Sequence, residues 1–247
     1  MPPAATSVRS DRSWPVRVLR RGVGLVVVLG LLLAVAFGVA WAVTPGVADA
    51  EQRVAERLAE HGGTPLAGEL PSRVAAALLA TEDSHFADHI GIDWRGALRA
   101  PVGLVTGTDQ GGSTVHQQLA RVLYEDGATD VVAKGRAVAL AVKLDRAWTD
   151  EQILRMYLDS VYFGHGFYGI SAAAEGYFGL PPDRLDWAQA SLLAGLVQAP
   201  SAYDPFQHPE RAAGRQAHVL DRLVAVGAFE PAEADDIASR QWGLVGR

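Results

Sequence analysis

Cysteine is absent from this 247-residue chain. A disulfide framework, a thiol nucleophile and a thiolate metal site are therefore excluded. The sequence also lacks internal repeats, low-complexity linkers and alternating runs of β-branched residues bounded by hairpin turns, so it gives no signal of a β-sheet fold. What it contains is 49% apolar and 20% charged residues, a balance typical of a globular protein.

An excess of basic residues is missing as well. The net charge is −6, and it is unevenly distributed. Residues 1–43 carry five arginines and one aspartate, a total of +4, so the remainder carries 17 basic and 27 acidic residues, a total of −10. Binding to duplex nucleic acid requires a basic surface. We therefore expect no nucleic-acid partner.

One long apolar run is present. Residues 22–43 read GVGLVVVLGLLLAVAFGVAWAV without a charge, and about 20 apolar residues are enough to span a bilayer core of roughly 30 Å. Five arginines precede the run and no basic residue follows it before Arg53. This asymmetry predicts a single-pass protein of the cell membrane, with residues 1–21 as a basic cytoplasmic tail and the rest outside.

A cleaved signal peptide is the competing interpretation, because Ala48-Asp49-Ala50 has the small-x-small pattern of a cleavage site. The apolar run is longer than the usual 7–15 residues of a signal peptide. The length therefore favours an uncleaved transmembrane helix.

Helix-start signals recur through the rest of the chain. Two S/T-x-x-Q patterns fit a capping box, an aspartate precedes a long apolar stretch, and a Pro-Ser pair opens the stretch that leads to Glu82. These signals are Thr114 with Gln117, Thr149 with Gln152, Asp186 before residues 187–197, and Pro71 with Ser72. They predict a mainly α domain over residues 66–247, preceded by a linker or juxtamembrane helix over 44–65.

Residues 94–107, WRGALRAPVGLVTG, combine apolar side chains with Arg95 and Arg99. Such a mixture is typical of an amphipathic element in a lipid headgroup layer. A partly buried loop and helix is an equal alternative.

The segment LLATEDSHFADHIGID, residues 78–93, places Glu82 and Asp83 behind an apolar run. An apolar approach would leave the Glu82 carboxylate partly desolvated and suited to accept a proton. Alternatively, Glu82 is a helix-end acid that faces water. His85 and His89 have the H-x-x-x-H spacing of a zinc pair, but Phe86 stands where such sites have glutamate.

The segment QGGSTVHQQLAR, residues 110–121, leads glycines into a capped helix, an arrangement suited to binding anions. Gln117, Gln118 and Arg121 would add polar and cationic groups. A flexible loop with a good cap explains the segment equally well. Lys134 and Arg136 precede a further apolar run, where they could face a pyrophosphate or water.

The order of these segments resembles that of the peptidoglycan glycosyltransferases, family 51 of the glycosyltransferases, which occur alone or joined to a penicillin-binding transpeptidase. The resemblance covers roughly residues 66–228. Five segments match in order: ATEDSHFADHIGID, QGGSTVHQQLAR, the weaker AKGRAVALAVKLDRAWTDEQIL, RMYLDSVYFGHGFYGISAAAEGYFG and ASLLAGLVQAPSAYDP.

The resemblance implies a lysozyme-like fold and an extracytoplasmic enzyme that polymerises lipid II with inversion at the donor sugar. It implies Glu82 as the catalytic base, with Asp83, Phe86, His89 and Gly91 supporting that motif. It further implies substrate and pyrophosphate contacts at Ser113, Thr114, Gln117, Gln118, Arg121, Lys134 and Arg215. Lipid II, the growing glycan strand and other cell-wall synthesis proteins are the implied partners. A divalent cation, Mg²⁺ or Mn²⁺, is left open, and no organic cofactor is expected.

The sequence departs from the family pattern in its third segment. Ala137 stands where the family has a second important glutamate, and Ala133 replaces an arginine. Asp159 stands where asparagine is common. Glu125, Asp130 and Asp145 are candidates to replace the missing carboxylate. A catalytically degenerate protein that binds glycan, lipid II or a cell-wall assembly partner is therefore the alternative function.

Overall fold

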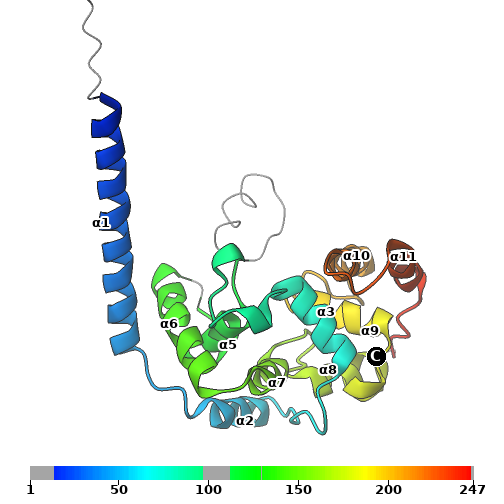
Figure 1. Ribbon diagram of the computed structural model, residues 1–247. Coiled ribbons are helices and arrows are strands. Elements are labelled where there is room, and N and C mark those ends of the chain that lie inside the picture. The colour runs from blue at the N-terminus through cyan, green and yellow to red at the C-terminus, as the bar shows by residue number, and fades with distance from the viewer. Residues whose placement is uncertain (1–13, 97–111, 129, 246–247) are drawn as a thin grey trace, which may run out of the picture. The chain divides into compact units, whose positions relative to one another are not determined.

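The computed structural model describes residues 14–96, 112–128 and 130–245. The chain divides into two units, Met1–Val43 and Thr44–Arg247, which are described separately. Figure 1 shows that the described parts of both units are helical. The only β-pairing in these ranges is an isolated bridge between Tyr162 and Tyr168. The prediction of a mainly α protein is confirmed.

The first unit contains helix α1 (Trp14–Val43). Its stretch Arg20–Val43 is 24 residues long with a mean hydropathy of 2.8, so the helix is long and apolar enough to cross a membrane. Membrane anchors and secretion signals share this property. Most of the apolar side chains described along it are exposed, whereas Ala40 and Trp41 near its end are half-buried.

The second unit is a helical domain. Its α-helices are α2 (Ala50–Glu60), α3 (Ser72–Glu82), α5 (Val115–Tyr124), α6 (Val131–Ala147), α7 (Asp150–Ser160), α8 (Ile170–Phe178), α9 (Trp187–Leu196), α10 (Pro209–Ala225) and α11 (Pro231–Ser239). Two short 3₁₀ helices, η1 (Phe86–Asp88) and η2 (Pro182–Arg184), lie between them.

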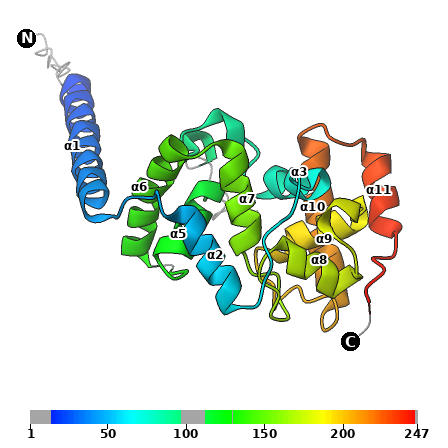
Figure 2. The same ribbon diagram turned by 90° about the horizontal axis from the view of Figure 1, so that it is seen from below.

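These helices pack as two groups, which Figure 2 shows from below. In the first group, α5 packs against α2, α6 and α7. In the second, α3 packs against α9 and α10, and α11 packs against α9 and α10. Helix α8, which follows α7 in the chain, packs against it.

The packing of α5 against α6 follows from their apolar spacing. On α5, the buried residues Val115, Leu119 and Leu123 recur every four positions. On α6, buried alanines and leucines recur with the same helical period, at Ala133, Ala137, Leu140, Ala141 and Leu144. Such stripes bury one face of each helix.

The predicted helix starts are confirmed. Thr149 and Asp186 form complete capping boxes with Gln152 and Gln189 at the starts of α7 and α9. The Thr114 hydroxyl accepts a hydrogen bond from the backbone N–H of Gln117. Each cap satisfies backbone donors that a helix start leaves free.

The segment that follows α1 is integrated into the domain. The Lys143 ammonium donates to the carbonyl of Thr44 at 2.8 Å, and the Trp148 indole donates to the carbonyl of Val47 at 2.9 Å. Helix α2 buries Val54 and Leu58 in the common core. The predicted amphipathic element 94–107 lies mostly outside the described residues.

Candidate active site

Glu82 is the last residue of α3, a helix whose Val74, Ala77 and Leu78 are buried. Its side chain is 13% exposed, so the carboxylate is mostly removed from water. Oε2 accepts a 2.9 Å hydrogen bond from the Gln118 amide on α5, and Oε1 lies 3.3 Å from the Arg215 guanidinium on α10. The carboxylate therefore joins the two helix groups.

Arg215 reaches Glu82 because α9 and α10 approach closely. Its side chain is only 6% exposed, and its Nε donates to the Gly195 carbonyl at 3.3 Å. A Cβ atom at Gly195 would lie 3.0 Å from Arg215 Cγ. Glycine at position 195 thus leaves room for the arginine stem.

Tyr157 fixes the orientation of the Gln118 amide. Its hydroxyl donates a 2.7 Å hydrogen bond to Gln118 Oε1, which leaves the amide N–H₂ group facing Glu82. Burial, and then the negative charge of Glu82, raises the pKa of the Tyr157 hydroxyl well above its usual value. Tyr157 therefore remains a donor, and the three side chains form one ordered chain of hydrogen bonds.

Asp83, next to Glu82, holds the following loop against α5. Its Oδ1 lies 2.9 Å from His89 Nε2, and its Oδ2 accepts from the backbone N–H of Val115 at 2.9 Å. Burial is the largest single influence on His89 and opposes its protonation, but the hydrogen bond to Asp83 and the charges of Asp83 and Asp93 together outweigh it and raise the pKa of His89. Asp83 and His89 thus fix the loop that follows the candidate base.

Gly91 makes a second connection between this loop and the helix group of α5. Its carbonyl accepts from the Thr114 hydroxyl at 2.9 Å. Its φ is +85°, and a Cβ atom there would lie 2.6 Å from the Ala141 carbonyl oxygen on α6. Glycine is required at this position. The Thr114 hydroxyl is committed to Gly91 and to the helix cap, so its role here is to position α5.

Two predicted cationic residues have side chains without a hydrogen bond or ion pair within the described ranges. Arg121 lies on α5, one turn beyond Gln118, and is partly exposed. Lys134 lies in the first turn of α6 and is exposed. Ser113 and Gln117, at the start of α5, are partly exposed. These four residues are available to an anionic ligand.

Ala137 lies in the core and is 2% exposed. Two of the carboxylates considered as replacements for the missing glutamate have other roles. Asp130 caps α6 by accepting from the N–H groups of Val132 and Ala133. Glu125 is buried and pairs with Arg136, whose Nε donates to it at 3.0 Å. The third, Asp145, lies near His116.

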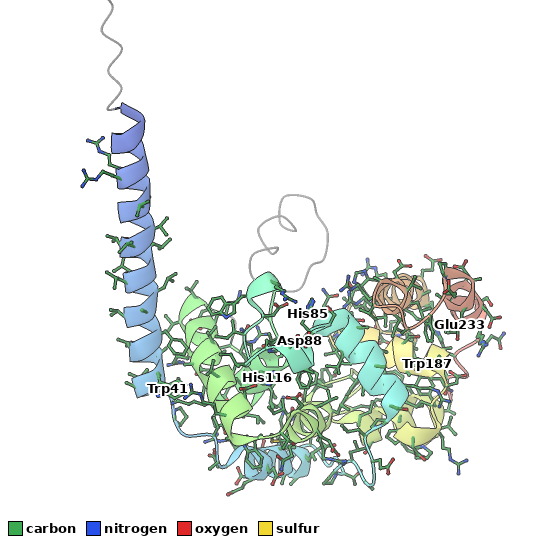
Figure 3. All side chains as sticks on the ribbon, viewed as in Figure 1. Trp41, His85, Asp88, His116, Trp187 and Glu233 are labelled. Carbon is green, nitrogen blue, oxygen red and sulfur yellow. The ribbon has the colours of Figure 1, made fainter. Side chains whose placement is uncertain are left out.

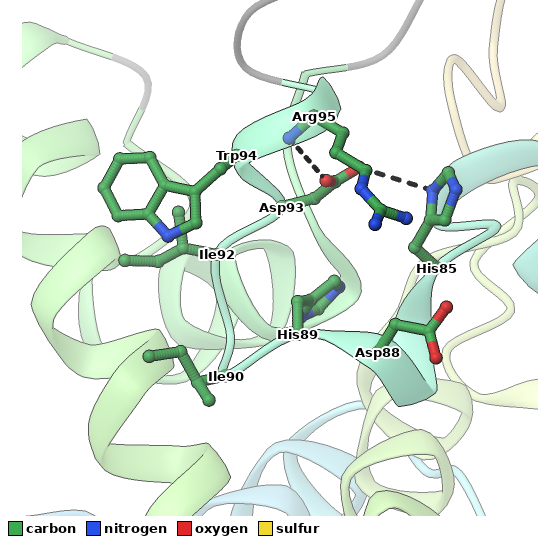
Figure 4. A pocket seen from close by; sticks show the side chains of 8 residues that line it. All are labelled: His85, Asp88, His89, Ile90, Ile92, Asp93, Trp94 and Arg95. Atoms are coloured by element: carbon green, nitrogen blue, oxygen red, sulfur yellow. Dashed lines mark hydrogen bonds and ion pairs between the residues drawn. The ribbon is translucent and has the colours of Figure 1, made fainter.

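A pocket of about 630 Å³ lies beside the loop that follows Glu82 (Figure 4). In Figure 4, one side carries Ile90, Ile92 and Trp94, and the other carries His85, Asp88 and Arg95, with His89 between them. Trp94 is 67% exposed and Ile90 is 58% exposed. The pocket thus has one apolar and one charged wall.

The idea of a zinc pair at His85 and His89 is wrong in its geometry. It required one continuous helix, but α3 ends at Glu82 and only η1 lies between the two histidines. His85 Nδ1 lies 3.6 Å from Asp93 Oδ2, whereas His89 pairs with Asp83.

Sequence patterns did not single out Tyr157 or His116. Both lie at buried positions of amphipathic helices, where an aromatic ring is expected to serve the core. The hydrogen bond from Tyr157 to Gln118 joins residues 39 positions apart. Only the packing of α7 on α5 brings them together.

Comparison with known proteins supports one family. The family described as Transglycosylase matches residues 52–224. Penicillin-binding protein 1A of Mycolicibacterium smegmatis is 39% identical over 173 residues, which cover 68% of this chain and 22% of that protein. Penicillin-binding protein 1A of Escherichia coli is 37% identical over 169 residues, covering 68% and 20%. The chain thus spans about a fifth of the length of these two relatives.

A shorter relative from Cupriavidus necator, provisionally named a transglycosylase, is 38% identical over 169 residues, covering 68% of this chain and 73% of that protein. The crystal structure of penicillin-binding protein 1A from Haemophilus influenzae aligns with a TM-score of 0.45 and 21% identity, over 74% of this chain and 18% of that one. The family match extends from α2 to α10 and includes Glu82, Gln118 and Arg215. The chain belongs to the transglycosylase family, the peptidoglycan glycosyltransferases that its five motifs predicted.

Proposed function

We propose that this protein polymerises lipid II into glycan strands in peptidoglycan synthesis. The 4-hydroxyl of an acceptor GlcNAc attacks C1 of a donor MurNAc from the face opposite the leaving group. The bond from C1 to the pyrophosphate oxygen breaks, a new C1–O4 bond forms, and undecaprenyl pyrophosphate leaves. The configuration at C1 is inverted.

Glu82 is the proposed base, and its environment is the observation that carries the proposal. A sugar hydroxyl is a weak nucleophile, so a positioned base that takes its proton during attack contributes about 10²–10⁴ in rate. The Glu82 carboxylate is mostly buried and is held by Gln118 and Arg215 on two different helices. Arg215 places a positive charge 3.3 Å from Oε1 and Gln118 donates to Oε2, so both carboxylate oxygens are held in place.

The leaving pyrophosphate requires cations and hydrogen-bond donors. Arg121 and Lys134 supply positive charge without a competing ion pair among the described residues, and Ser113 and Gln117 lie at the start of α5. We assign these four residues to the pyrophosphate. A divalent cation, Mg²⁺ or Mn²⁺, would add charge there and remains a prediction.

The substrate carries a lipid, so we place the domain outside the cell membrane with α1 as its anchor. The apolar wall formed by Ile90, Ile92 and Trp94 supports a position close to the lipid surface. Asp49 supports an uncleaved anchor, because its carboxylate binds Arg53 at 2.8 Å and the Tyr124 hydroxyl at 2.9 Å. Cleavage after Ala50 would remove this carboxylate from the domain.

The test is glycan synthesis from labelled lipid II by the full chain in detergent with Mg²⁺ or Mn²⁺. We expect long strands from the natural protein and none from Glu82→Gln. Glu60→Gln, a change of an exposed acid at the end of α2, is the matched control and should leave synthesis unchanged. Absence of strands from the natural protein, where an established polymerase makes them, would reject the proposal.

Ala137 favours a second candidate function, a degenerate relative that binds lipid II or glycan without polymerising it. In that case, lipid II should bind the natural protein and remain unreacted. Ala137→Glu then tests whether the missing carboxylate is the cause. Synthesis that appears only in this variant would support the degenerate protein, and synthesis by the natural protein would exclude it.

A further inference from the structure

His116 is a buried polar residue that the proposed reaction does not use. It lies on α5 inside the domain (Figure 3), and its side chain is 0% exposed. Neither ring nitrogen has a hydrogen-bond partner in the part of the chain that the structure describes. An unsatisfied buried polar group destabilises the folded state, so a group of this kind calls for an explanation.

Two carboxylates lie close to the ring. Asp145, in the last turn of α6, has its Oδ1 3.8 Å from His116 Nε2. Asp150 is the first residue of α7 and is exposed. One nitrogen of His116 and one oxygen of each aspartate all lie within 4.8 Å of one another. Residues on α5, α6 and α7 thus bring one imidazole and two carboxylates close together.

The donor groups of this cluster are those of a cation site. Asp145 and Asp150 bring two carboxylates close together. The buried His116 ring makes no hydrogen bond within the residues that the structure describes, so a ring nitrogen is open to a metal ion. Imidazole and carboxylate are groups that bind such ions, the imidazole through a ring nitrogen without a proton.

The spacing is close to that of a coordination sphere. Ligands about 2.0–2.2 Å from a tetrahedral metal ion lie roughly 3.4 Å apart. The 3.8 Å separation of His116 and Asp145 is near this value. Because Asp150 is exposed, its side chain can turn toward the others without disturbing the core.

We propose that His116, Asp145 and Asp150 bind one divalent transition metal ion, such as Zn²⁺. Imidazole nitrogen favours such ions over Mg²⁺ and Ca²⁺, which prefer oxygen ligands. The ion ties α5, α6 and α7 together and leaves coordination positions open to water. None of the three ligands is among the residues assigned to the pyrophosphate, so binding of the ion does not depend on the proposed reaction.

His116 also lies within 4.8 Å of ligand atoms of Asp83 and His89. Those two residues are already engaged. Asp83 binds His89 and the Val115 N–H, and His89 Nδ1 accepts from the Gly91 N–H at 3.1 Å. Asp145 and Asp150 make no comparable hydrogen bond through their side chains within the described residues, so the geometry favours the cluster with the two aspartates.

The experiment uses the full chain, without a polyhistidine tag, in detergent after treatment with EDTA. Titration with Zn²⁺ in a calorimeter should show one saturable site, and Zn²⁺ should raise the melting temperature by several degrees. Co²⁺ should give d–d absorption bands of low-symmetry coordination with a nitrogen ligand. Mg²⁺ at the same concentration should produce neither effect.

Asp150→Asn and Asp145→Asn should weaken Zn²⁺ binding at least tenfold, and His116→Leu should abolish it. Glu151→Gln is the matched control, because Glu151 is an exposed acid in the same first turn of α7. It should bind Zn²⁺ like the natural protein. Leu at position 116 removes an unsatisfied polar group, so the metal-free variant should melt no lower than the natural protein.

Absence of saturable Zn²⁺ binding to the natural protein would overturn the proposal. So would unchanged affinity in Asp150→Asn, a surface change that does not threaten folding. If His116→Leu lost binding while both aspartate variants kept it, the ion would belong to Asp83 and His89, and the site proposed here would be wrong.

Discussion

Arg215 Nη2 lies 3.3 Å from Glu82 Oε1 although the two residues are 133 positions apart in the chain. Both side chains are mostly buried, so the pair is screened little by water. Removing one partner of such a pair leaves the other charge without compensation, which is costly. Loss of Arg215 is therefore expected both to destabilise the domain and to displace the proposed base.

Arg215→Gln is expected to lower the rate of strand synthesis by on the order of 10²-fold, because a misplaced reacting group costs about this much. It should also lower the melting temperature. Arg215→Lys keeps the charge and should recover part of both losses. Equal rates for the natural protein and Arg215→Gln would show that the pair does not position Glu82.

Tyr157→Phe removes the hydroxyl that orients the Gln118 amide. The amide can then turn its oxygen toward Glu82, which weakens the hold on the carboxylate. One hydrogen bond is worth roughly 0.5–1.5 kcal/mol, so we expect kcat to fall about 3- to 10-fold. KM for lipid II should change little, because Tyr157 is buried away from any ligand. A change confined to KM would contradict this role.

The buried carboxyl of Asp159 is expected to make the stability of the folded domain depend on pH. Burial raises its pKa to about 6, although the Leu66 N–H donates to its Oδ1 at 2.9 Å. A carboxyl whose pKa is higher in the folded state stabilises that state fully at low pH, and the contribution is lost as pH rises through about 6. The ionised form therefore costs on the order of 2–3 kcal/mol near neutral pH.

Asp159→Asn removes this ionisation and retains an oxygen for the Leu66 N–H. We expect the variant to melt several degrees above the natural protein at about pH 7.5, and the difference to vanish near pH 4. Asp183→Asn, a change of an aspartate that is 70% exposed, is the control and should show no such trend. A difference in melting temperature between Asp159→Asn and the natural protein that does not change with pH would mean that packing, and not ionisation, causes it.

The absence of cysteine permits a direct test of membrane topology. Single cysteines at Ser10 and at the exposed Ser239 should react differently with a membrane-impermeant maleimide on intact cells. We expect labelling only of Ser239→Cys, because the arginines before α1 favour a cytoplasmic N-terminus. Labelling of Ser10→Cys alone would reverse the proposed orientation.

Several features of this protein follow from local sequence. Helix starts at Thr149 and Asp186 were predictable because capping depends on residues within one turn. The apolar run of α1 was predictable from length and composition. The expected helix end at Glu82 is also observed, whereas the H-x-x-x-H pairing of His85 and His89 assumed a helix beyond it and failed because none is present there.

The sequence by itself determined the helices, the apolar α1 and the order of the motifs, because these depend on neighbouring residues and on hydrophobic period. Tertiary structure alone decided that Arg215 and Gln118 hold Glu82, that Tyr157 orients Gln118, and that His116 faces two aspartates. Those contacts arise where separate helices pack, and the spacing of residues along one chain carries no measure of the distances between helices.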